Sequence, residues 1–485
     1  MSVFHSSHRP GLIWGIFGAA LALWFGLAWT VVHEHPEFKV VKIAKTDLKP
    51  MSVVVQPGTS YFFTWGVTAR PRSKLIAQRS LPEEERFGNT FQQTHSVLTN
   101  LRDDLEQVGL NLRDVVHVRA YVVGDAENPP DFESSDRAFR DFFGTALQPH
   151  VPAITKIGIA RLFLPAYQTE IEFIAAFPPG RGPLVPGTRP WLNQERLRRV
   201  ETRPEWRSIG RPMFQMSTGK AVIGGQALAV TSALQATPIN PKLPEAAWTY
   251  GTTAQQSTSL IKRGEAMLAT AGIDYKDVFF VRTMMFPEKG VNIGRNFGIF
   301  GTEYGKFFNN PANPNRPTRT VMSAPGYAYR KEALALEMYA LAKDPATAVP
   351  EDARLKAYPR PGQPISDVVV VSPRAALGWM AGIVEPAAGN LEAQATACLQ
   401  TLETRLTSLG GGLADVAHIR AYVVAKDMEP RLAVAGWMKA YSAMFGTEKN
   451  PHKPALTVLP VVALPGGGLV EVESLAALPP SAAKK

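Results

Sequence analysis

The chain has 485 residues and a mass of 52.9 kDa, which at roughly 100 to 200 residues per domain predicts about three domains. Apolar residues make up 45% and charged residues 19%, a composition that excludes a disordered chain, a collagen-like repeat and a polytopic membrane protein. The formal net charge of +10 favours anionic partners or membrane surfaces, although it is modest for this length.

The N-terminal region contains an uncharged stretch from Gly11 to Val32. At 1.5 Å per residue it is long enough to cross a hydrocarbon core of about 30 Å. It ends in Trp29-Thr30-Val31-Val32, without the small residues of a signal cleavage site. We therefore expect residues 1–49 to hold a tail, an uncleaved single-pass anchor at 11–32 and a spacer, in a bacterial inner membrane.

The orientation of this anchor stays open. Arg9 precedes the stretch, and four lysines follow it: Lys39, Lys42, Lys45 and Lys49. The lysines favour a cytoplasmic body, because positive charge gathers on the cytoplasmic side. The likeness to an uncleaved export signal favours an exported body.

Cysteine and metal-binding motifs are scarce. Cys398 is the single cysteine, which excludes an intramolecular disulfide and a cysteine-ligated zinc or iron–sulfur site. It lies on an apolar helical face, which favours its interpretation as a small core residue over that of a nucleophile. The run His33-Glu34-His35 is more typical of a solvated boundary than of a metal site. We expect neither a metal site nor a cofactor.

A pattern recurs three times along the chain. In each copy sixteen residues separate a glutamine from a glycine, five separate that glycine from an aspartate, and five more lead to an arginine in a strand-like run. The copies place these residues at Gln93, Gly109, Asp114 and Arg119; at Gln256, Gly272, Asp277 and Arg282; and at Gln394, Gly410, Asp415 and Arg420. Such a repeat fixes the domain count before any chemistry is assumed.

Each copy predicts the same elements. A helix-period segment ends at the glycine and is followed by a strand rich in β-branched residues. A second helix, a strand after Pro152, Pro317 or Pro454, and a strand carrying a glutamate come next. A hydrophobic strand pair precedes the first helix, with residues 62–67, 221–226 and 377–383 at corresponding places. We expect an α+β fold of β-β-α-β-α-β-β units, each a mixed sheet with two helices on one face. The expected boundaries are 50–178, 213–343 and 364–478, with linkers at 179–212 and 344–363 and a tail at 479–485.

The first linker is basic, with seven arginines and three glutamates between Arg189 and Pro212, beside Trp191 and Trp206. Such a stretch is able to bind RNA or anionic lipid. A solvated linker is the favoured interpretation, and nucleic acid is not among the partners we expect.

These ordered elements resemble the RidA/YjgF family from about residue 50 to 478, in three tandem copies. The likeness rests on the glutamine helix, the Gly-x4-Asp strand, the Phe-Phe-Gly helix end, the Pro-x-Arg-Thr strand and the final glutamate strand. The resemblance implies a fold of the chorismate-mutase-like type. It also implies that this chain is a covalent pseudo-trimer with ligand clefts between its copies.

The resemblance further implies hydrolysis of reactive enamines and imines to 2-keto acids and ammonia. The family's Pro-x-Arg arginine holds the substrate carboxylate, and a glutamate on the last strand orients or activates water. Only the second copy keeps the arginine, as Arg319, where the others have Ile154 and Leu456. We therefore expect one cleft, with Arg319 and Glu337 as catalytic residues and Arg319 and Gly224 as substrate-binding residues.

Several positions depart from the family pattern. The serine of its Thr-Ser-Gly-Gln strand corresponds to Trp65, Gly224 and Ala381, and a cysteine two residues after the arginine corresponds to Val321. Glu172, Glu337 and Glu473 recur even where the arginine is lost, which indicates a role in the fold at least as strongly as one in catalysis. Arg119, Arg282 and Arg420 are expected to form ion pairs between copies. His117 and His418 hold equivalent positions in the first and third copies. The second copy has Phe280 there, which argues against a shared catalytic histidine.

Two functions from different classes follow. One is a membrane-anchored deaminase of 2-iminobutanoate or 2-iminopropanoate. The other is a non-catalytic protein that binds a small carboxylate, or acts as a scaffold, for a partner enzyme at the membrane.

Overall fold

The computed structural model describes residues 38–41, 52–71, 83–125, 128–162, 164, 166–178, 206–209, 219–222, 225–244, 247–285, 293–323, 334–343, 348–360, 365–425 and 430–483. The expected membrane span at 11–32 and Gly224 lie outside this set, as does the basic linker apart from residues 206–209. Among the helices within these ranges, none has the length and apolar character needed to cross a bilayer.

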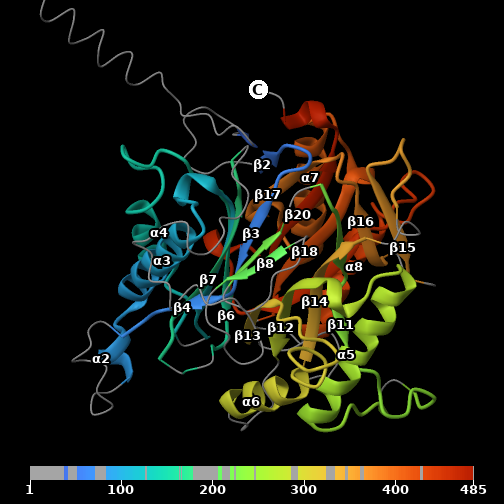
Figure 1. Ribbon diagram of the computed structural model, residues 1–485, viewed down its shortest axis with the longest axis horizontal. Coiled ribbons are helices and arrows are strands. Elements are labelled where there is room, and N and C mark those ends of the chain that lie inside the picture. Colours follow the sequence, from blue (N-terminus) through green and yellow to red (C-terminus); the bar gives the residue numbers. More distant parts are fainter. Residues whose placement is uncertain are drawn as a thin grey trace, which may run out of the picture. The chain divides into compact units, whose positions relative to one another are not determined.

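Three modules with corresponding elements follow one another along the chain, and module 3 has one long first strand where the other two have two short ones (Figure 1). Module 1 contains β3 (Tyr61–Thr64), β4 (Val67–Thr68), α3 (Thr90–Gln107), β5 (Val115–Val123), α4 (Phe132–Arg140), β6 (Ala153–Ile159) and β7 (Thr169–Ala176), with the short α2 (Glu83–Phe87) before α3. Module 2 contains β10 (Ala227–Thr231), β11 (Leu234–Gln235), α5 (Thr253–Thr270), β12 (Val278–Met285), α6 (Ile293–Tyr304), β13 (Thr318–Ser323) and β14 (Leu334–Ala342). Module 3 contains β17 (Ala376–Val384), α7 (Leu391–Ser408), β18 (Val416–Val424), α8 (Pro430–Ser442), β19 (Ala455–Val461) and β20 (Val470–Leu478). The mixed helix and strand content expected from the repeat is confirmed.

The strands of each module pair in the same way. The strand after the first helix runs parallel to the next strand and antiparallel to the last one, as β5 does with β6 and β7, β12 with β13 and β14, and β18 with β19 and β20. The first strand of each module pairs antiparallel with the last, as in β3–β7, β10–β14 and β17–β20.

The recurring glutamine and glycine hold the first helix of each module. Asn89, Thr252 and Asn390 cap the amino ends of α3, α5 and α7. Gln93, fully buried, donates to the carbonyls of Gly88 and Ala166. After the helices the chain turns at Gly109, Gly272 and Gly410, whose φ values of 81°, 65° and 75° lie in the left-handed region that favours glycine.

Three further strand pairs connect the modules. They are β1 (Phe38–Val41) with β2 (Ser52–Val55), β8 (Trp206–Ile209) with β9 (Gly219–Val222), and β15 (Leu355–Pro359) with β16 (Ser366–Val371). Strands β8 and β15 lie within the stretches expected to be linkers, so these stretches contribute to the sheets instead of only joining domains.

The second and third of these pairs each extend the sheet of the module that precedes them. Strand β9 pairs with β3 of module 1, and β16 pairs with β10 of module 2. Strand β2 precedes every module, and it pairs with β17 of module 3. Strand β2 therefore pairs with module 3 in the way that β9 pairs with module 1 and β16 with module 2. This pairing between the beginning and the end of the chain closes the three modules into a ring.

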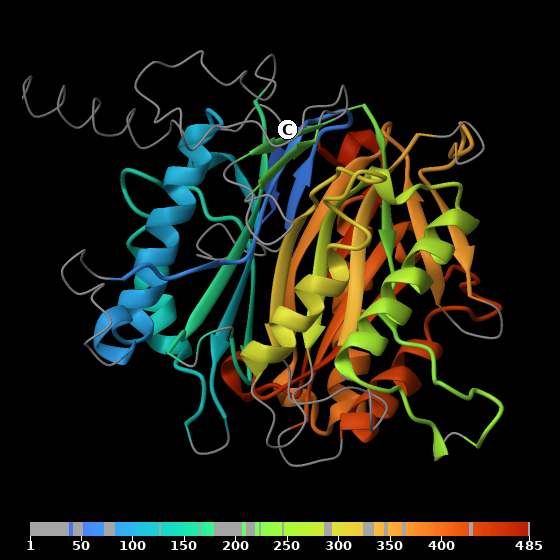
Figure 2. The same ribbon diagram turned by 60° about the horizontal axis from the view of Figure 1, so that its bottom comes forward.

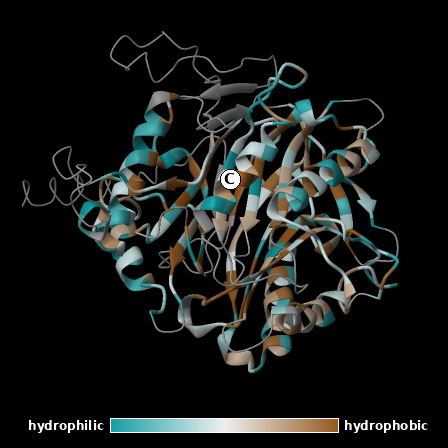
Figure 3. Ribbon diagram, turned by 90° about the horizontal axis from the view of Figure 1, so that it is seen from below, coloured by the Kyte–Doolittle hydropathy of each residue, from teal (hydrophilic) through white to brown (hydrophobic). Residues whose placement is uncertain are grey.

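Each module has its own apolar core between its sheet and its helices. Figure 2 shows α3 and α5 alongside the strands of their modules, and Figure 3 shows the apolar residues concentrated along the strands. Two further clusters draw residues from all three modules. One includes Phe63, Tyr339 and Trp379, and the other includes Tyr121 and Tyr422. The modules therefore share a common interior.

Candidate functional site

The interior contains a ring of six charged side chains, Arg119, Glu172, Arg282, Glu337, Arg420 and Glu473, which we call the ion ring. Each is at most 2% exposed. Arg119 Nη1 lies 2.6 Å from Glu172 Oε1, and its Nε lies 2.5 Å from Glu473 Oε1. Arg420 reaches Glu473 at 2.9 Å and Glu337 at 2.7 Å, and Arg282 pairs with both Glu172 and Glu337. The expected ion pairs between copies are confirmed.

Strand register explains this alternation. Arg119 lies opposite Glu172, Arg282 opposite Glu337, and Arg420 opposite Glu473, so each arginine has a partner on the neighbouring strand of its own sheet. Its second partner belongs to another module. Three positive and three negative charges balance, as buried charges require.

Hydroxyl groups complete the ion ring and affect its ionisation. Thr320 donates to Glu172 at 2.6 Å, and Thr457 donates to Glu337 at 2.7 Å. Burial opposes ionisation of Glu172, but the Arg282 and Arg119 guanidinium groups outweigh it and lower its pKa to about 2. Burial opposes ionisation of Glu473 in the same way, and Arg119 holds its pKa well below the usual value. These two carboxylates therefore stay charged in the interior.

Glu337 belongs to this ion ring and does not accompany Arg319. On β12, Val281 lies opposite Arg319 and Arg282 lies opposite Thr320. Because successive side chains of a strand point to opposite faces, Arg319 and the Arg282–Glu337 pair occupy opposite faces of the module 2 sheet. The structure does not bring together the two residues expected to share a catalytic cleft.

Arg319 lies on the helix side of that sheet, under α6. Its guanidinium carbon is 5.2 Å from the centre of the Phe300 ring and 4.7 Å from that of Tyr304. The residue is only 7% exposed, and within the described part of the chain its Nε and Nη1 atoms are buried without a hydrogen-bond partner. Burial lowers the pKa of Arg319. A buried cation without a counter-charge is rare in folded proteins.

Two buried hydroxyl groups lie on the same side of the module 2 sheet as this cation. The Tyr304 hydroxyl has no hydrogen-bond partner among the described residues, and burial raises its pKa. Thr283 follows Val281 on the same face of β12, opposite Val321, and its hydroxyl is also buried without a described partner. We call Arg319, Phe300, Tyr304 and Thr283 the Arg319 site. Its unpaired donors suit a small anion.

The register also corrects the position of the serine. Ile174, Tyr339 and Leu475 each follow a glutamate of the ion ring by two residues, and their partners on the first strands are Phe63, Val230 and Trp379. The residue that corresponds to Trp65 and Ala381 is therefore Ser232, and not Gly224, which lies eight residues earlier and outside the described residues. Sequence comparison missed Ser232, although Thr231-Ser232 carries the Thr-Ser signal of the family.

Ser232 lies at a different junction from Arg319. Fully buried, its hydroxyl donates to the Ser366 carbonyl at 2.5 Å and accepts from the Leu456 amide at 2.7 Å. These contacts join module 2 to module 3. Strand β13, which carries Arg319, lies instead against β3 of module 1. The serine and the arginine of the family pattern therefore do not meet in one cleft.

The remaining candidate residues have structural surroundings. Burial, reinforced by Arg119, lowers the pKa of His117 to about 3, and burial holds that of His418 well below the ordinary value. Cys398 is fully buried, and burial raises the pKa of its thiol to about 12. The prediction that Cys398 is a core residue is confirmed. No cluster of metal-binding side chains occurs within the described ranges.

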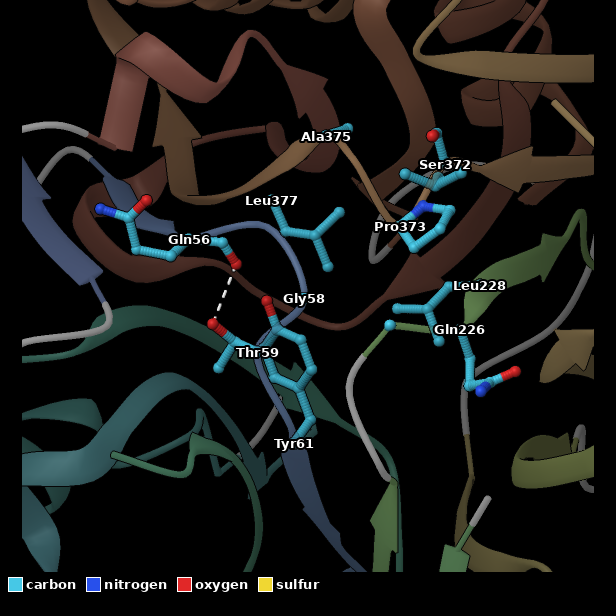
Figure 4. Close-up of a pocket in the computed structure, with 12 residues that line it drawn as sticks. Gln56, Gly58, Thr59, Tyr61, Gln226, Leu228, Ser372, Pro373, Ala375 and Leu377 are labelled. Atoms are coloured by element: carbon cyan, nitrogen blue, oxygen red, sulfur yellow. Dashed lines mark hydrogen bonds between the residues drawn. The ribbon is translucent and has the colours of Figure 1, made fainter. Parts of the chain in front are cut away.

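A separate pocket lies where the connecting strand pairs meet the modules (Figure 4). Gln56, Thr59 and Tyr61 line it from the segment that joins β2 to β3, and Gln226 and Leu228 from the start of β10. The segment that joins β16 to β17 contributes Ser372, Pro373, Ala375 and Leu377. Thr59 Oγ1 donates to the Gln56 carbonyl at 2.9 Å, and Gln56 Nε2 donates to the Ala483 carbonyl at 3.0 Å. Its lining holds no charged side chain, so this pocket does not match the anionic ligand that the Arg319 site suits.

Comparison with known structures finds relatives that each match part of this chain. RidA from an Antarctic Psychrobacter species shares 25% identity over 21% of this chain and 80% of its own, with a TM-score of 0.18. A putative endoribonuclease from Thermotoga maritima shares 24% over 27% and 89%, with a TM-score of 0.19. A Rid family protein of unknown function from Yersinia pestis shares 22% over 29% and 99%, with a TM-score of 0.23.

The family model described as Endoribonuclease L-PSP matches residues 80–177 and 356–478. These regions cover most of module 1 and all of module 3. Module 2, with the Arg319 site, lies between them. Two regions of this chain, together less than half of it, therefore match the Endoribonuclease L-PSP model, and this match supports the expected resemblance to the RidA/YjgF family.

Proposed function

We propose that the protein binds a small carboxylate at the Arg319 site. The observation that carries the proposal is the buried guanidinium of Arg319, whose Nε and Nη1 atoms lack a described partner. Leaving such a group unpaired costs several kcal/mol. A bound carboxylate offsets this cost, because its two oxygens accept parallel hydrogen bonds from a guanidinium.

The neighbouring hydroxyl groups narrow the ligand further. The hydroxyls of Tyr304 and Thr283 are able to donate or accept a hydrogen bond. Aromatic rings cover the guanidinium and limit the space for a long polar ligand. A compact acid with a polar group beside its carboxylate, such as a 2-oxo or 2-imino acid, matches these partners.

We propose as well that the three modules are tandem RidA-like copies that form a pseudo-trimer. The shared order of elements, the shared register and the closed ring support this proposal. Because the copies are linked in one chain, each site is free to change independently of the others. The retention of the arginine in module 2 alone fits such divergence.

Hydrolysis of enamines and imines is the second candidate. It is favoured by the same guanidinium, since fixing the carboxylate of a 2-imino acid aligns the imine carbon for attack by water. Glu337 is held by Arg282 and Arg420 in the ion ring, so the proposed activity depends on positioning by Arg319 and not on a glutamate base.

The experiment is calorimetric titration of the detergent-solubilised full chain with pyruvate. We expect one site per chain, and Arg319→Met should weaken binding about 100-fold, the loss of two charge-assisted hydrogen bonds. Arg295→Met is the matched control, because Arg295 is an exposed residue of α6. Absence of binding, or equal binding by both variants, overturns the proposal. Ammonia release from 2-iminobutyrate by the same samples separates the enzyme from the binding protein.

The membrane anchor at residues 11–32 is a further proposal, and it rests on the uncharged stretch in the sequence. It would hold the protein in a bacterial inner membrane, near a partner enzyme that produces or consumes the ligand. Resistance of the full chain to carbonate extraction, lost when 11–32 is deleted, tests it. Release of the intact chain from membranes by carbonate would contradict this proposal.

A further inference from the structure

Module 1 also holds a buried cation against an aromatic ring of its second helix. Lys156, on β6, is 5% exposed. Its Nζ lies 4.3 Å from the centre of the Phe139 ring and 2.6 Å from Asp136 Oδ1. In contrast to Arg319, this cation therefore has a carboxylate partner within its own module.

The two cations occupy corresponding places. Phe139 stacks on Phe143 four residues later in module 1, as Tyr304 stacks on Phe308 in module 2. Ile154 holds the register position of Arg319, and Lys156 is two residues further along the same face of its strand. Both side chains therefore extend from corresponding strands, β6 and β13, to the equivalent ring on the second helix of their modules.

The position of the carboxylate differs between the modules. Asp136 precedes Phe139 by three residues, and Gly301 precedes Tyr304 by three. A Cβ atom built on Gly301 would have no described atom within 4 Å. Module 2 therefore has a glycine beside open space where module 1 has a carboxylate.

We infer that module 1 contains a second, latent site for a small carboxylate, and that the Asp136 side chain occupies it as an internal ligand. The inference rests on the proposed function of the Arg319 site. Asp136 is 35% exposed at its side chain, whereas Lys156 is 6% exposed. The internal carboxylate is thus more accessible to solvent than the amine that it neutralises.

This inference assigns a different state to each module. Module 1 carries a cation neutralised by its own chain, and module 2 carries a cation open to a ligand. Module 3 has Leu456 and Val458 on the corresponding strand face, beside Tyr441, and no cation there. We therefore expect the wild-type chain to bind one anion, although the described helix-side faces of modules 1 and 2 each hold a cation.

The experiment measures the number of pyruvate molecules bound per full-length chain by calorimetry. Asp136→Ala should raise the number from one to two. Asp136→Ala combined with Arg319→Met should bind one, and adding Lys156→Met to that pair should bind none. Asp136→Asn, which keeps the shape of the side chain and removes its charge, provides a second test if the alanine variant folds poorly.

The reverse substitution tests the same idea in module 2. Gly301→Asp places a carboxylate near Arg319 and should weaken pyruvate binding at least about tenfold, a change of about 1.4 kcal/mol. A folded Asp136→Ala or Asp136→Asn variant that still binds one pyruvate overturns the inference. If the wild-type chain binds none, the proposed function fails. The Asp136→Ala, Arg319→Met variant then tests the latent site by itself.

Discussion

The two faces of the module sheets differ in how their buried cations are paired. On the inner face, every arginine of the ion ring lies between two glutamates, and the arrangement is the same in all three modules. On the helix side, the corresponding strand face holds Lys156 with an internal carboxylate partner in module 1, Arg319 without a described counter-charge in module 2, and apolar residues in module 3. The ion pairs that join modules on the inner face are repeated, and the charged positions on the helix side have diverged.

This contrast separates two kinds of buried arginine. Arg282 and Arg319 belong to one module, and both are more than nine-tenths buried. Arg282 is neutralised within the protein, so its removal leaves two buried carboxylates each without one of their partners. Arg319 has no described counter-charge, so its removal leaves no carboxylate unpaired. Stability and ligand binding should therefore depend on different arginines.

The largest expected effect is on the ion ring. Arg282→Met should lower the free energy of unfolding by about 3–5 kcal/mol, because Glu172 and Glu337 each lose a buried partner. Chemical denaturation of the full chain in detergent measures it. Arg295→Met, which removes an exposed charge in the same module, should change stability by less than about 0.5 kcal/mol. Equal losses for the two variants would show that the ion ring contributes nothing specific.

A second effect follows from the lowered pKa of Glu172. Its folded pKa of about 2 lies below the ordinary value of 4.5, so its contribution to stability is fully present above pH 4.5 and is lost as the pH falls toward 2. The denaturation midpoint should fall over this range in the wild-type chain. Arg282→Met, which lacks one cause of the shift, should show a shallower fall. Parallel curves would contradict this origin of the pH dependence.

The smallest expected effect is at the Arg319 site. Arg319→Met should change the free energy of unfolding by less than about 1 kcal/mol, or raise it, because methionine fills similar space without burying an unpaired charge. Denaturation without ligand measures this change. A loss as large as that of Arg282→Met would mean that Arg319 has a structural partner, and it would remove the basis of the proposed anion site.

Much of the module fold was open to prediction from the sequence. The equal spacing from Gln93 to Arg119 in every copy predicted a helix, a glycine turn and a strand, which are found as α3, Gly109 and β5. Local physics decides these elements: helix periodicity, a left-handed turn and β-branched residues. The recurring arginines and glutamates also indicated contacts between copies, which the ion ring confirms.

The site was harder to predict, because it depends on pairing between distant strands. The face on which Arg319 lies is set by its register with Val281, and no spacing within β13 reveals that register. The strand expected at residues 221–226 belongs in part to β9, which pairs with module 1. Counting from it placed the serine position at Gly224 in place of Ser232. No sequence pattern pointed to Asp136, because its contact with Lys156 forms only when the chain is folded.

The closure of the ring by β1 and β2 has a consequence for the order in which the protein is made. During synthesis the first strands leave the ribosome long before their partner β17, which lies more than three hundred residues later. Module 1, with β9 on its sheet, is synthesised in full before β17, the partner of β2 in module 3, has been made. The last folding event therefore joins the oldest and the newest parts of the chain. Until it happens, the edges of β2 and β17 are open to pairing with another nascent chain.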